Sequence, residues 1–201
     1  MSLTIPSGRF GAYIFDCDGT LVDSMPLHLE AWNYGLEKAG AKWKLAEDFF
    51  YGSAGKSLSQ VVDELNAMYS AQLEADEVGH HKEAFYHEKI ESLEAFQDVV
   101  EHLEIARASG IPTAVASGSA RLAVEKSLEV TNLIGLVDTI VAAEDVFRGK
   151  PAPDCFLLAA DRLGVEPEGC LVFEDGEAGL EAARVCGMAT VEVDARRGAK
   201  V

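Results

Sequence analysis

The chain carries the stretch FDCDGTLVDS at residues 15–24, and its first residue ends the apolar run Ala12–Phe15. A short run of this kind is typical of a buried strand, and two carboxylates, Asp16 and Asp18, follow where it ends. Because side chains of an extended chain alternate with a period of two, both carboxylates project to the same side. Gly19 then allows a sharp turn. The stretch therefore predicts a strand that delivers two acidic groups to one edge of a sheet.

Further short apolar runs alternate with helical periodicity along the rest of the chain. We expect strands at Pro112–Ala116, Thr139–Ala142, Cys170–Phe173 and Thr190–Val193. The helices between them should stop where a glycine precedes an apolar residue, at Gly110-Ile111, Gly164-Val165 and Gly187-Met188. Strand and helix alternating in this way indicate an α/β fold with a parallel sheet covered on both faces.

Residues 25–94 interrupt this alternation, since no convincing strand occurs where a single crossover helix would be enough. Helices are expected instead, two amphipathic and one more polar, at Pro26–Ala39, Ser57–Met68 and Ala75–Leu93. We interpret residues 25–94 as a helical cap domain inserted into a core made of residues 1–24 and 95–201. Ligands of open α/β sheets bind at the carboxyl ends of the strands, so an insertion at this point can cover the site.

Composition and net charge indicate which kinds of binding partner the protein can have. The 201 residues are 48% hydrophobic and carry a formal net charge of −17. A core can therefore be buried, and a surface of this charge repels nucleic acid. No apolar run approaches the ~18 residues of a membrane-spanning helix, and residues 1–10 lack a signal-peptide stretch. The four cysteines form no Cys-x-x-Cys pair and are expected to be core residues of a reducing, cytoplasmic protein: Cys17, Cys155, Cys170 and Cys186.

A second acidic pair, Glu174-Asp175, closes the expected strand at Cys170–Phe173. If that strand neighbours the first, its carboxylates meet Asp16 and Asp18, and such a cluster is costly without a cation. A few hard oxygen ligands with room for water and phosphate suit Mg²⁺. The alternative for the first pair is a solvated turn-forming loop. Taken alone, the second pair would be interpreted as an acidic loop that precedes a helix. Together the two pairs favour a magnesium site.

Two more elements supply groups that attract anions. Ser117-Gly118-Ser119 follows the expected second strand and leads into a helix, whose N-terminal N–H groups can hold phosphate oxygens. Lys150 stands before Pro151, which favours an extended backbone at the lysine. Its ammonium could neutralise both the carboxylates and a phosphoryl group. On their own, these serines would be helix N-caps and the lysine a solvated surface charge.

In this order and spacing, the four motifs resemble those of the haloacid dehalogenase-like hydrolase superfamily. Within it they are most similar to the branch of β-phosphoglucomutase and small sugar-phosphate phosphatases, which carries a helical cap between the first and second motifs. The resemblance covers nearly the whole chain. It implies a Rossmann-like parallel sheet in the order 5-4-1-2-3, flanked by helices. One departure is Gly176, where this branch often has Ser or Thr.

The resemblance also implies the roles of the core residues. Asp16 would be the nucleophile that forms an aspartyl-phosphate, and Asp18 the general acid and then the general base. Mg²⁺ would be held by the Asp16 carboxylate, the Asp18 backbone carbonyl and Asp175, with Glu174 helping directly or through water. The phosphoryl oxygens would be stabilised by the remaining groups, namely Ser117, the Gly118 amide, Lys150 and, as a weaker candidate, Thr20.

Three cap residues are candidates for substrate binding. His28 and Trp32 match cap residues near the site in β-phosphoglucomutase and in related phosphatases, so they do not separate the two activities. The loop 52–57 matches a specificity loop but lacks the arginine with which the mutase grips a second phosphate. Lys56 is the available substitute, although an ammonium is a point charge and not a bidentate fork. The alternatives are a helix-surface position for His28 and packing within the cap for Trp32.

These observations predict a Mg²⁺-dependent phosphatase that acts on a small sugar phosphate or a similar phosphorylated metabolite. We expect a monomer, with neither nucleic acid nor membrane as a partner. The first alternative is a β-phosphoglucomutase, because both reactions pass through the same aspartyl-phosphate. The second is a non-catalytic protein that binds a phosphorylated ligand on the same fold.

Overall fold

A computed structural model describes residues 3–53 and 56–198. The chain divides into two compact units, one formed by the chain up to Ser24 together with the chain from Leu93 onward, the other by Met25–Ser92. Leu93 and Glu94, which we expected in the insertion, thus group with the first unit. The reason is backbone pairing, since the Asp23 N–H donates to the Glu94 carbonyl at 2.9 Å.

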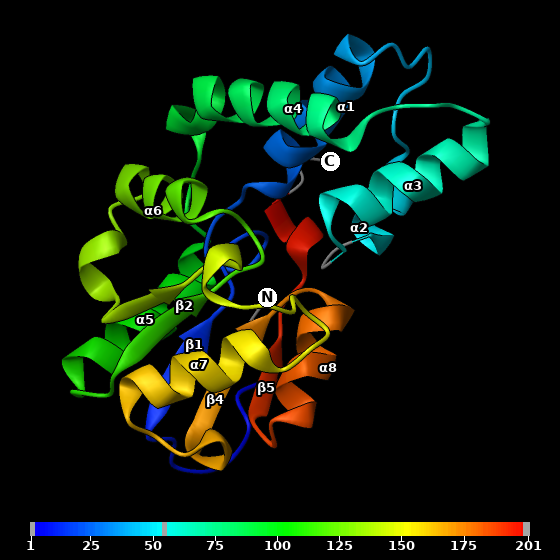
Figure 1. Ribbon diagram of the computed structural model, residues 1–201. Coiled ribbons are helices and arrows are strands. Elements are labelled where there is room, and N and C mark those ends of the chain that lie inside the picture. Colours follow the sequence, from blue (N-terminus) through cyan, green and yellow to red (C-terminus); the bar gives the residue numbers. More distant parts are fainter. Residues whose placement is uncertain (1–2, 54–55, 199–201) are drawn as a thin grey trace. The chain divides into compact units, whose positions relative to one another are not determined.

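The first unit contains a five-stranded parallel sheet in the order β3-β2-β1-β4-β5 (Figure 1). This is the expected order 5-4-1-2-3 read from the opposite edge, and the prediction is confirmed. Each strand lies within one residue of its expected bounds: β1 Ala12–Phe15, β2 Thr113–Ala116, β3 Thr139–Val141, β4 Cys170–Glu174 and β5 Ala189–Glu192. The central strand β1 places Phe15 between Val115 of β2 and Phe173 of β4.

Helices cover both faces of this sheet: α5 Gln97–Ala108, α6 Arg121–Val130, α7 Asp154–Leu163 and α8 Glu177–Val185. On one face, α7 and α8 bury Phe156 and Ala183 against Ile14 of β1 and Val172 of β4 (Figure 1). On the other face, Phe15 stacks on Phe173, and His102 of α5 lies 5.4 Å from Phe173 between ring centroids. All four cysteines are buried free thiols, as expected for core residues.

The glycine helix stops form as the sequence predicts. Gly110, Gly164 and Gly187 have φ angles of 70°, 68° and 75°, values that a β-carbon disfavours. The next residue then returns its N–H to the helix, as Met188 does to the Ala183 carbonyl at 3.0 Å. Gly110 and Gly187 turn the chain toward β2 and β5, and Gly164 turns it toward the 3₁₀ helix Pro167–Gly169 that precedes β4.

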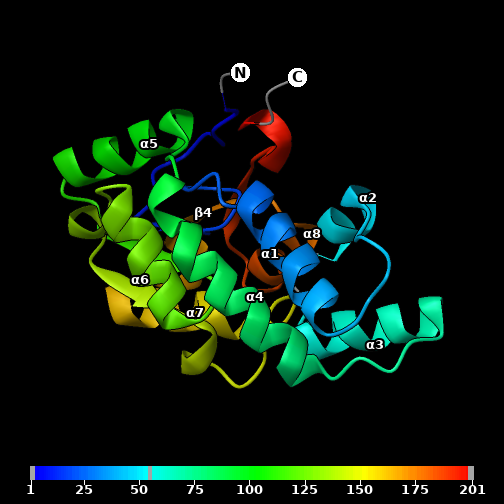
Figure 2. The ribbon, with the colours of Figure 1, turned by 90° about the horizontal axis from the view of Figure 1, so that it is seen from above.

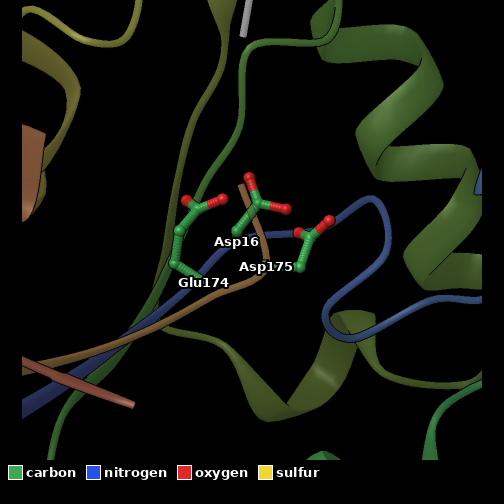
Figure 3. A group of neighbouring side chains, drawn as sticks. All are labelled: Asp16, Glu174 and Asp175. Atoms are coloured by element: carbon green, nitrogen blue, oxygen red, sulfur yellow. The ribbon is translucent and has the colours of Figure 1, made fainter. Parts of the chain in front are cut away.

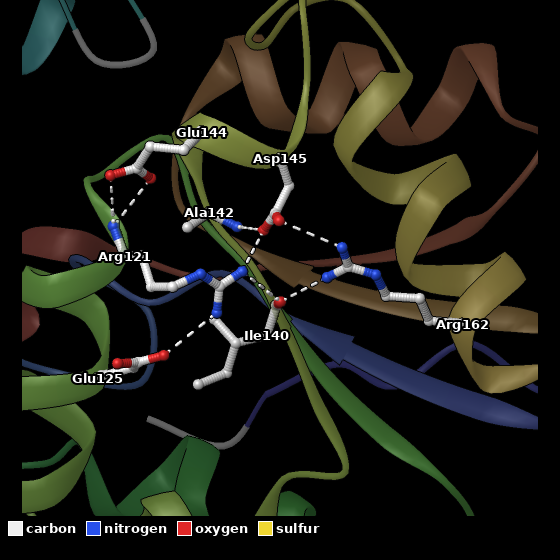
Figure 4. Close-up of polar contacts among 7 residues, drawn as sticks. All are labelled: Arg121, Glu125, Ile140, Ala142, Glu144, Asp145 and Arg162. Atoms are coloured by element: carbon white, nitrogen blue, oxygen red, sulfur yellow. Dashed lines mark hydrogen bonds and ion pairs between the residues drawn. The ribbon is translucent and has the colours of Figure 1, made fainter.

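Two arginines donate hydrogen bonds to the backbone of the edge strand β3 (Figure 4). Arg121 of α6 and Arg162 of α7 donate to the Ile140 carbonyl at 3.2 and 2.7 Å, and both contact the Asp145 carboxylate. The Ala142 N–H, at 2.8 Å from the same carboxylate, and the guanidinium groups outweigh the effect of burial and lower the pKa of Asp145. The network therefore anchors the chain where it leaves the edge strand.

The second unit is helical, with α1 Met25–Lys38, α2 Glu47–Gly52, α3 Leu58–Tyr69 and α4 Ala75–Lys89. The short helix α2 was not expected, and Phe50 is its only buried residue, so it lacks the repeated apolar face that reveals a helix in a sequence. The expected continuation of α4 to Leu93 is wrong, because a 3₁₀ turn follows at Ile90–Ser92. No helix within residues 3–53 and 56–198 combines the length and apolarity needed to cross a membrane.

Helices α1 and α4 pack along each other (Figure 2). The contact depends on Gly35 of α1, where a β-carbon would lie only 2.5 Å from the Val78 carbonyl oxygen of α4. A backbone atom cannot rotate away as a side chain can, so this position requires glycine.

We predict that Gly35→Ala destabilises the protein by about 2 kcal/mol, because the added methyl forces α1 and α4 apart. Urea unfolding followed by circular dichroism measures this loss. The control is Gly52→Ala, where a β-carbon would meet no atom within 4 Å, and it should be neutral or slightly stabilising. Equal losses in the two variants would contradict the close packing.

We predict that Asp145→Asn destabilises the protein near neutral pH, and that this difference shrinks in acid. The folded pKa of Asp145 lies below its ordinary value, so its charge stabilises the fold above the unfolded pKa of about 3.9 and stops doing so as pH falls through the folded value. Unfolding free energies measured from pH 3 to 7 test this. The control is Glu125→Gln, which removes an exposed ion-pair partner of Arg121 and should have a small effect. A difference that does not vary with pH would refute the prediction.

Candidate active site

Four loops meet at the carboxyl ends of the parallel strands. Asp16 follows β1 and continues its ladder, since its N–H donates to the Phe173 carbonyl of β4 at 2.9 Å. Ser117 follows β2 and donates its N–H to the Val141 carbonyl of β3 at 2.9 Å. Glu174 ends β4, so the sheet itself brings the acidic and serine motifs to one edge.

Lys150 forms the centre of a buried charge network at this edge. Its Nζ atom lies 2.6 Å from Asp16 Oδ1 and 2.7 Å from Glu174 Oε2, and it donates to the Ala116 carbonyl at 3.1 Å. All three charged residues are buried. Burial disfavours a charged amine, but the two carboxylates outweigh it and raise the pKa of Lys150 well above its ordinary value. The ammonium is therefore a permanent positive charge at the site.

The carboxylate of Glu174 is held from two sides. Its Oε2 atom faces Lys150, and its Oε1 atom accepts the Gly176 N–H at 3.0 Å. It also lies against the first turn of α8, where a β-carbon on Gly179 would come within 2.1 Å of Glu174 Oε2. Gly179 thus leaves the space that the carboxylate occupies. Sequence reasoning missed this residue, because a glycine inside a helix carries no sign of the side chain that it accommodates.

Asp16, Glu174 and Asp175 point their carboxylates toward one another (Figure 3), and each offers an oxygen within 4.8 Å of the others. Burial, and then the charge of Glu174, raise the pKa of Asp175 to about 7. Burial and Glu174 also raise the pKa of Asp16, against the lowering effect of Lys150. Negative charge is therefore in excess in this cluster. Hard oxygen donors with excess negative charge fit a divalent cation such as Mg²⁺.

The carboxylate of Asp18 is held by hydroxyl groups. Ser24 donates to Oδ1 at 2.6 Å, and Ser119 and Ser117 donate to Oδ2 at 2.7 and 3.4 Å. Sequence reasoning gave Ser24 no role and placed Ser119 in the anion-binding motif, but it assigned neither hydroxyl to Asp18. Ser119 follows Gly118 just before a helix, which is typical of an N-cap, but the residue that caps α6 is Ala120. Only the fold shows that both hydroxyls face Asp18.

Thr20 and Gly118 complete the set of predicted core residues. Thr20 is fully buried and donates its hydroxyl to Asp175 Oδ1 at 2.9 Å. Gly118 lies exposed between Ser117 and Ser119, and a β-carbon there would meet no atom within 4 Å. The structure thus links Thr20 to the acidic cluster and leaves space around the Gly118 backbone.

His28 and Trp32 lie on α1 in the second unit. His28 is half-buried and stacks on Tyr86 of α4 with 4.3 Å between ring centroids. Trp32 is 8% exposed, with Lys82 Nζ 5.9 Å from the centroid of its ring. Both side chains therefore contribute to the packing of α1 on α4.

Lys56 also lies in the second unit, just before α3. It is exposed, and its ammonium lies 2.7 Å from the Glu64 carboxylate. Its neighbours in the loop, Ala54 and Gly55, lie outside the described residues. The ammonium of this candidate substrate-binding residue is thus paired within its own unit.

Comparison with known proteins gives consistent matches over this chain. A family model described as haloacid dehalogenase-like hydrolase matches residues 10–187. Fructose-1-phosphate phosphatase YqaB of Escherichia coli is 38% identical over 189 residues, covering 92% of this chain and 97% of that protein. Hexitol phosphatase A of the same species is 32% identical over 192 residues, covering 93% and 84%. A hydrolase from Pseudomonas syringae of known structure superposes with a TM-score of 0.78 at 27% identity, covering 89% and 82%.

The family match runs from just before β1 to the end of α8. It includes every strand except β5 and all four loops at the carboxyl edge of the sheet. Fold, motif order and similarity agree over the same stretch of chain. The protein therefore belongs to the haloacid dehalogenase-like hydrolase family.

Proposed function

We propose that this hydrolase is a Mg²⁺-dependent phosphatase that cleaves a small sugar phosphate through an aspartyl-phosphate on Asp16. The observation that carries the proposal is the buried Lys150 ammonium, 2.6 Å from Asp16 Oδ1 beside two further carboxylates. This arrangement combines a nucleophile, a fixed cation and a set of hard oxygen donors. Catalysis of phosphoryl transfer relies on such positioning and electrostatic stabilisation.

The substrate class rests on the relatives. One is a fructose-1-phosphate phosphatase and another a hexitol phosphatase, and each aligns over most of its own length. A phosphorylated sugar or sugar alcohol is therefore the class that we assign to this chain.

In the proposed reaction, the Asp16 carboxylate attacks phosphorus, and the bond from phosphorus to the sugar oxygen breaks. Protonated Asp18 gives its proton to the leaving alkoxide. The Asp18 carboxylate then takes a proton from water, and that water attacks the aspartyl-phosphate. Phosphate leaves and the Asp16 carboxylate is restored. The hydroxyls of Ser24 and Ser119, at 2.6 and 2.7 Å, hold Asp18 for both proton transfers.

Charge on the transferring phosphoryl group needs balancing, because the site is itself acidic. The Asp16 and Asp175 carboxylates and the Asp18 carbonyl would hold Mg²⁺, with Glu174 contributing directly or through water. Bound there, the ion supplies positive charge that offsets the carboxylates and the phosphoryl oxygens. Lys150, Ser117 and the Gly118 N–H stabilise the same oxygens from the protein side.

The alternative activity is that of a β-phosphoglucomutase, which uses the same aspartyl-phosphate. A mutase also needs a grip on a second phosphate. The cap-loop cation available for this, Lys56, is paired with Glu64 at 2.7 Å. Loop 52–57 contains no arginine, and an ammonium lacks the bidentate grip that a guanidinium gives a phosphate. This difference supports hydrolysis rather than isomerisation.

We predict that Asp16→Asn lowers the turnover of 4-nitrophenyl phosphate with Mg²⁺ on the order of 10³-fold or more, because an amide cannot form the phosphorylated intermediate. Chelation of Mg²⁺ in the wild-type protein should give a similar loss, and added Mg²⁺ should restore activity. Asp161→Asn, at an exposed position of α7, is the matched control and should leave turnover unchanged. Full activity of Asp16→Asn would refute the assignment.

We predict that glucose 1-phosphate, fructose 1-phosphate and hexitol phosphates, offered as separate substrates with Mg²⁺, yield inorganic phosphate in ³¹P NMR spectra. Conversion of glucose 1-phosphate into glucose 6-phosphate would instead identify a mutase. Binding without any product from these substrates or from 4-nitrophenyl phosphate would favour the non-catalytic alternative.

A further inference from the structure

Arg197 connects the last described segment of the chain to the catalytic loop. It lies in the 3₁₀ helix η5 (Ala195–Gly198), which follows β5. Its Nη1 atom donates to the Gly19 carbonyl at 3.0 Å, and its Nη2 atom donates to the Thr20 carbonyl at 2.8 Å. These two carbonyls belong to the turn that directly follows Asp18. One side chain therefore holds two consecutive peptide groups next to a catalytic candidate.

The guanidinium of Arg197 is itself fixed in place. Its Nε atom lies 3.2 and 3.1 Å from the two oxygens of Asp98 in the first turn of α5, and Nη1 also donates to the Asp194 carbonyl at 2.7 Å. The group stacks over the Phe96 ring at 3.6 Å from the centroid. Only 15% of the side chain is exposed. All three nitrogens are engaged, so this arginine acts as a rigid planar bracket rather than as a solvated charge.

The bracketed turn leads to the acidic cluster through Thr20. The backbone carbonyl of Thr20 accepts from Arg197, and its side-chain hydroxyl donates to Asp175 Oδ1 at 2.9 Å. Within the turn, the N–H groups of Leu21 and Val22 return to the Cys17 carbonyl at 3.0 and 2.9 Å. A change at Arg197 would therefore reach Asp175 through a single intervening residue.

We propose that Arg197 is a positioning residue for the active site. It fixes the backbone of Gly19 and Thr20, so that the Thr20 hydroxyl stays on Asp175 and Asp18 keeps its place after β1. The expected effect on kcat rests on the proposed phosphatase function. The expected loosening of the turn in the absence of the arginine is independent of that function.

The kinetic test compares Arg197→Ala with Arg196→Ala, the exposed neighbour in η5. Using 4-nitrophenyl phosphate and Mg²⁺, Arg197→Ala should lower kcat by roughly tenfold or more, because small displacements of reacting groups are costly. KM should change less, since Arg197 has no assigned contact with the substrate. The kcat of Arg197→Lys should lie between those of the wild type and Arg197→Ala, because an ammonium lacks the planar fork that spans two carbonyls. Equal kcat values in the Arg196 and Arg197 alanine variants would overturn the proposal.

The route through Thr20 is tested by a double-mutant cycle. Thr20→Val removes the hydroxyl at nearly constant size and should lower kcat. In the Thr20→Val background, Arg197→Ala should lower kcat by a smaller factor than it does in the wild-type protein. The reason is that the contact between Thr20 and Asp175 is already lost. Fully additive losses would overturn this route.

A measurement without turnover separates this proposal from the proposed function. In Mg²⁺-free protein, the amides of Gly19, Leu21 and Val22 should exchange with deuterium faster in Arg197→Ala than in the wild type, while Arg196→Ala leaves them unchanged. Exchange at the wild-type rate would overturn the bracket even if the phosphatase assignment holds. If Arg197→Ala does not fold, Arg197→Lys provides the same comparison, with faster exchange at these amides as the expected result.

Discussion

The candidate active site depends on one buried ammonium that pairs with carboxylates at the ends of two different strands. Lys150 bridges Asp16 after β1 and Glu174 at the end of β4 at 2.6 and 2.7 Å. Removing charges from water is costly unless they are closely paired, so the network tolerates little displacement. Adjacent parallel pairing of β1 with β4 supplies the required register, and Gly179 leaves room for the Glu174 carboxylate. The packing that fixes the sheet therefore also fixes the positions of these charged groups.

This ammonium does not neutralise the site. Asp175, which lies beyond its direct hydrogen bonds, has a pKa raised to about 7 by burial and by Glu174. A phosphate ester brings further negative charge to the same place. Without a bound cation, the carboxylates would repel the phosphoryl group or take up protons. This charge excess is the electrostatic argument for the proposed Mg²⁺ dependence.

Much of this architecture could be predicted from local patterns. The strands, their order and the glycine stops follow from short apolar runs, helical periodicity and the family resemblance, and Asp16, Glu174 and Lys150 stand in recognisable motifs. The sequence did not reveal those contacts between distant residues that involve no recognisable motif. Gly179 was missed because its role is to be small beside a side chain of another element. Arg197, which holds the Gly19 turn, was missed for a similar reason, and Ser119 was placed in the anion-binding motif without its contact to Asp18.

The contacts around Arg197 also explain how a core interrupted by a long insertion holds the turn after Asp18 in a fixed shape. The chain leaves the core after Ser24 and returns at Leu93. On the core side of this gap, the Phe96 N–H donates to the Leu21 carbonyl at 2.9 Å, and Val22 bridges Ala95 in antiparallel fashion. Arg197 then joins the start of α5 to the turn after Asp18. The two chain segments that flank the insertion are therefore held together by contacts within the core. These contacts fix the turn after Asp18 without any residue of 25–92.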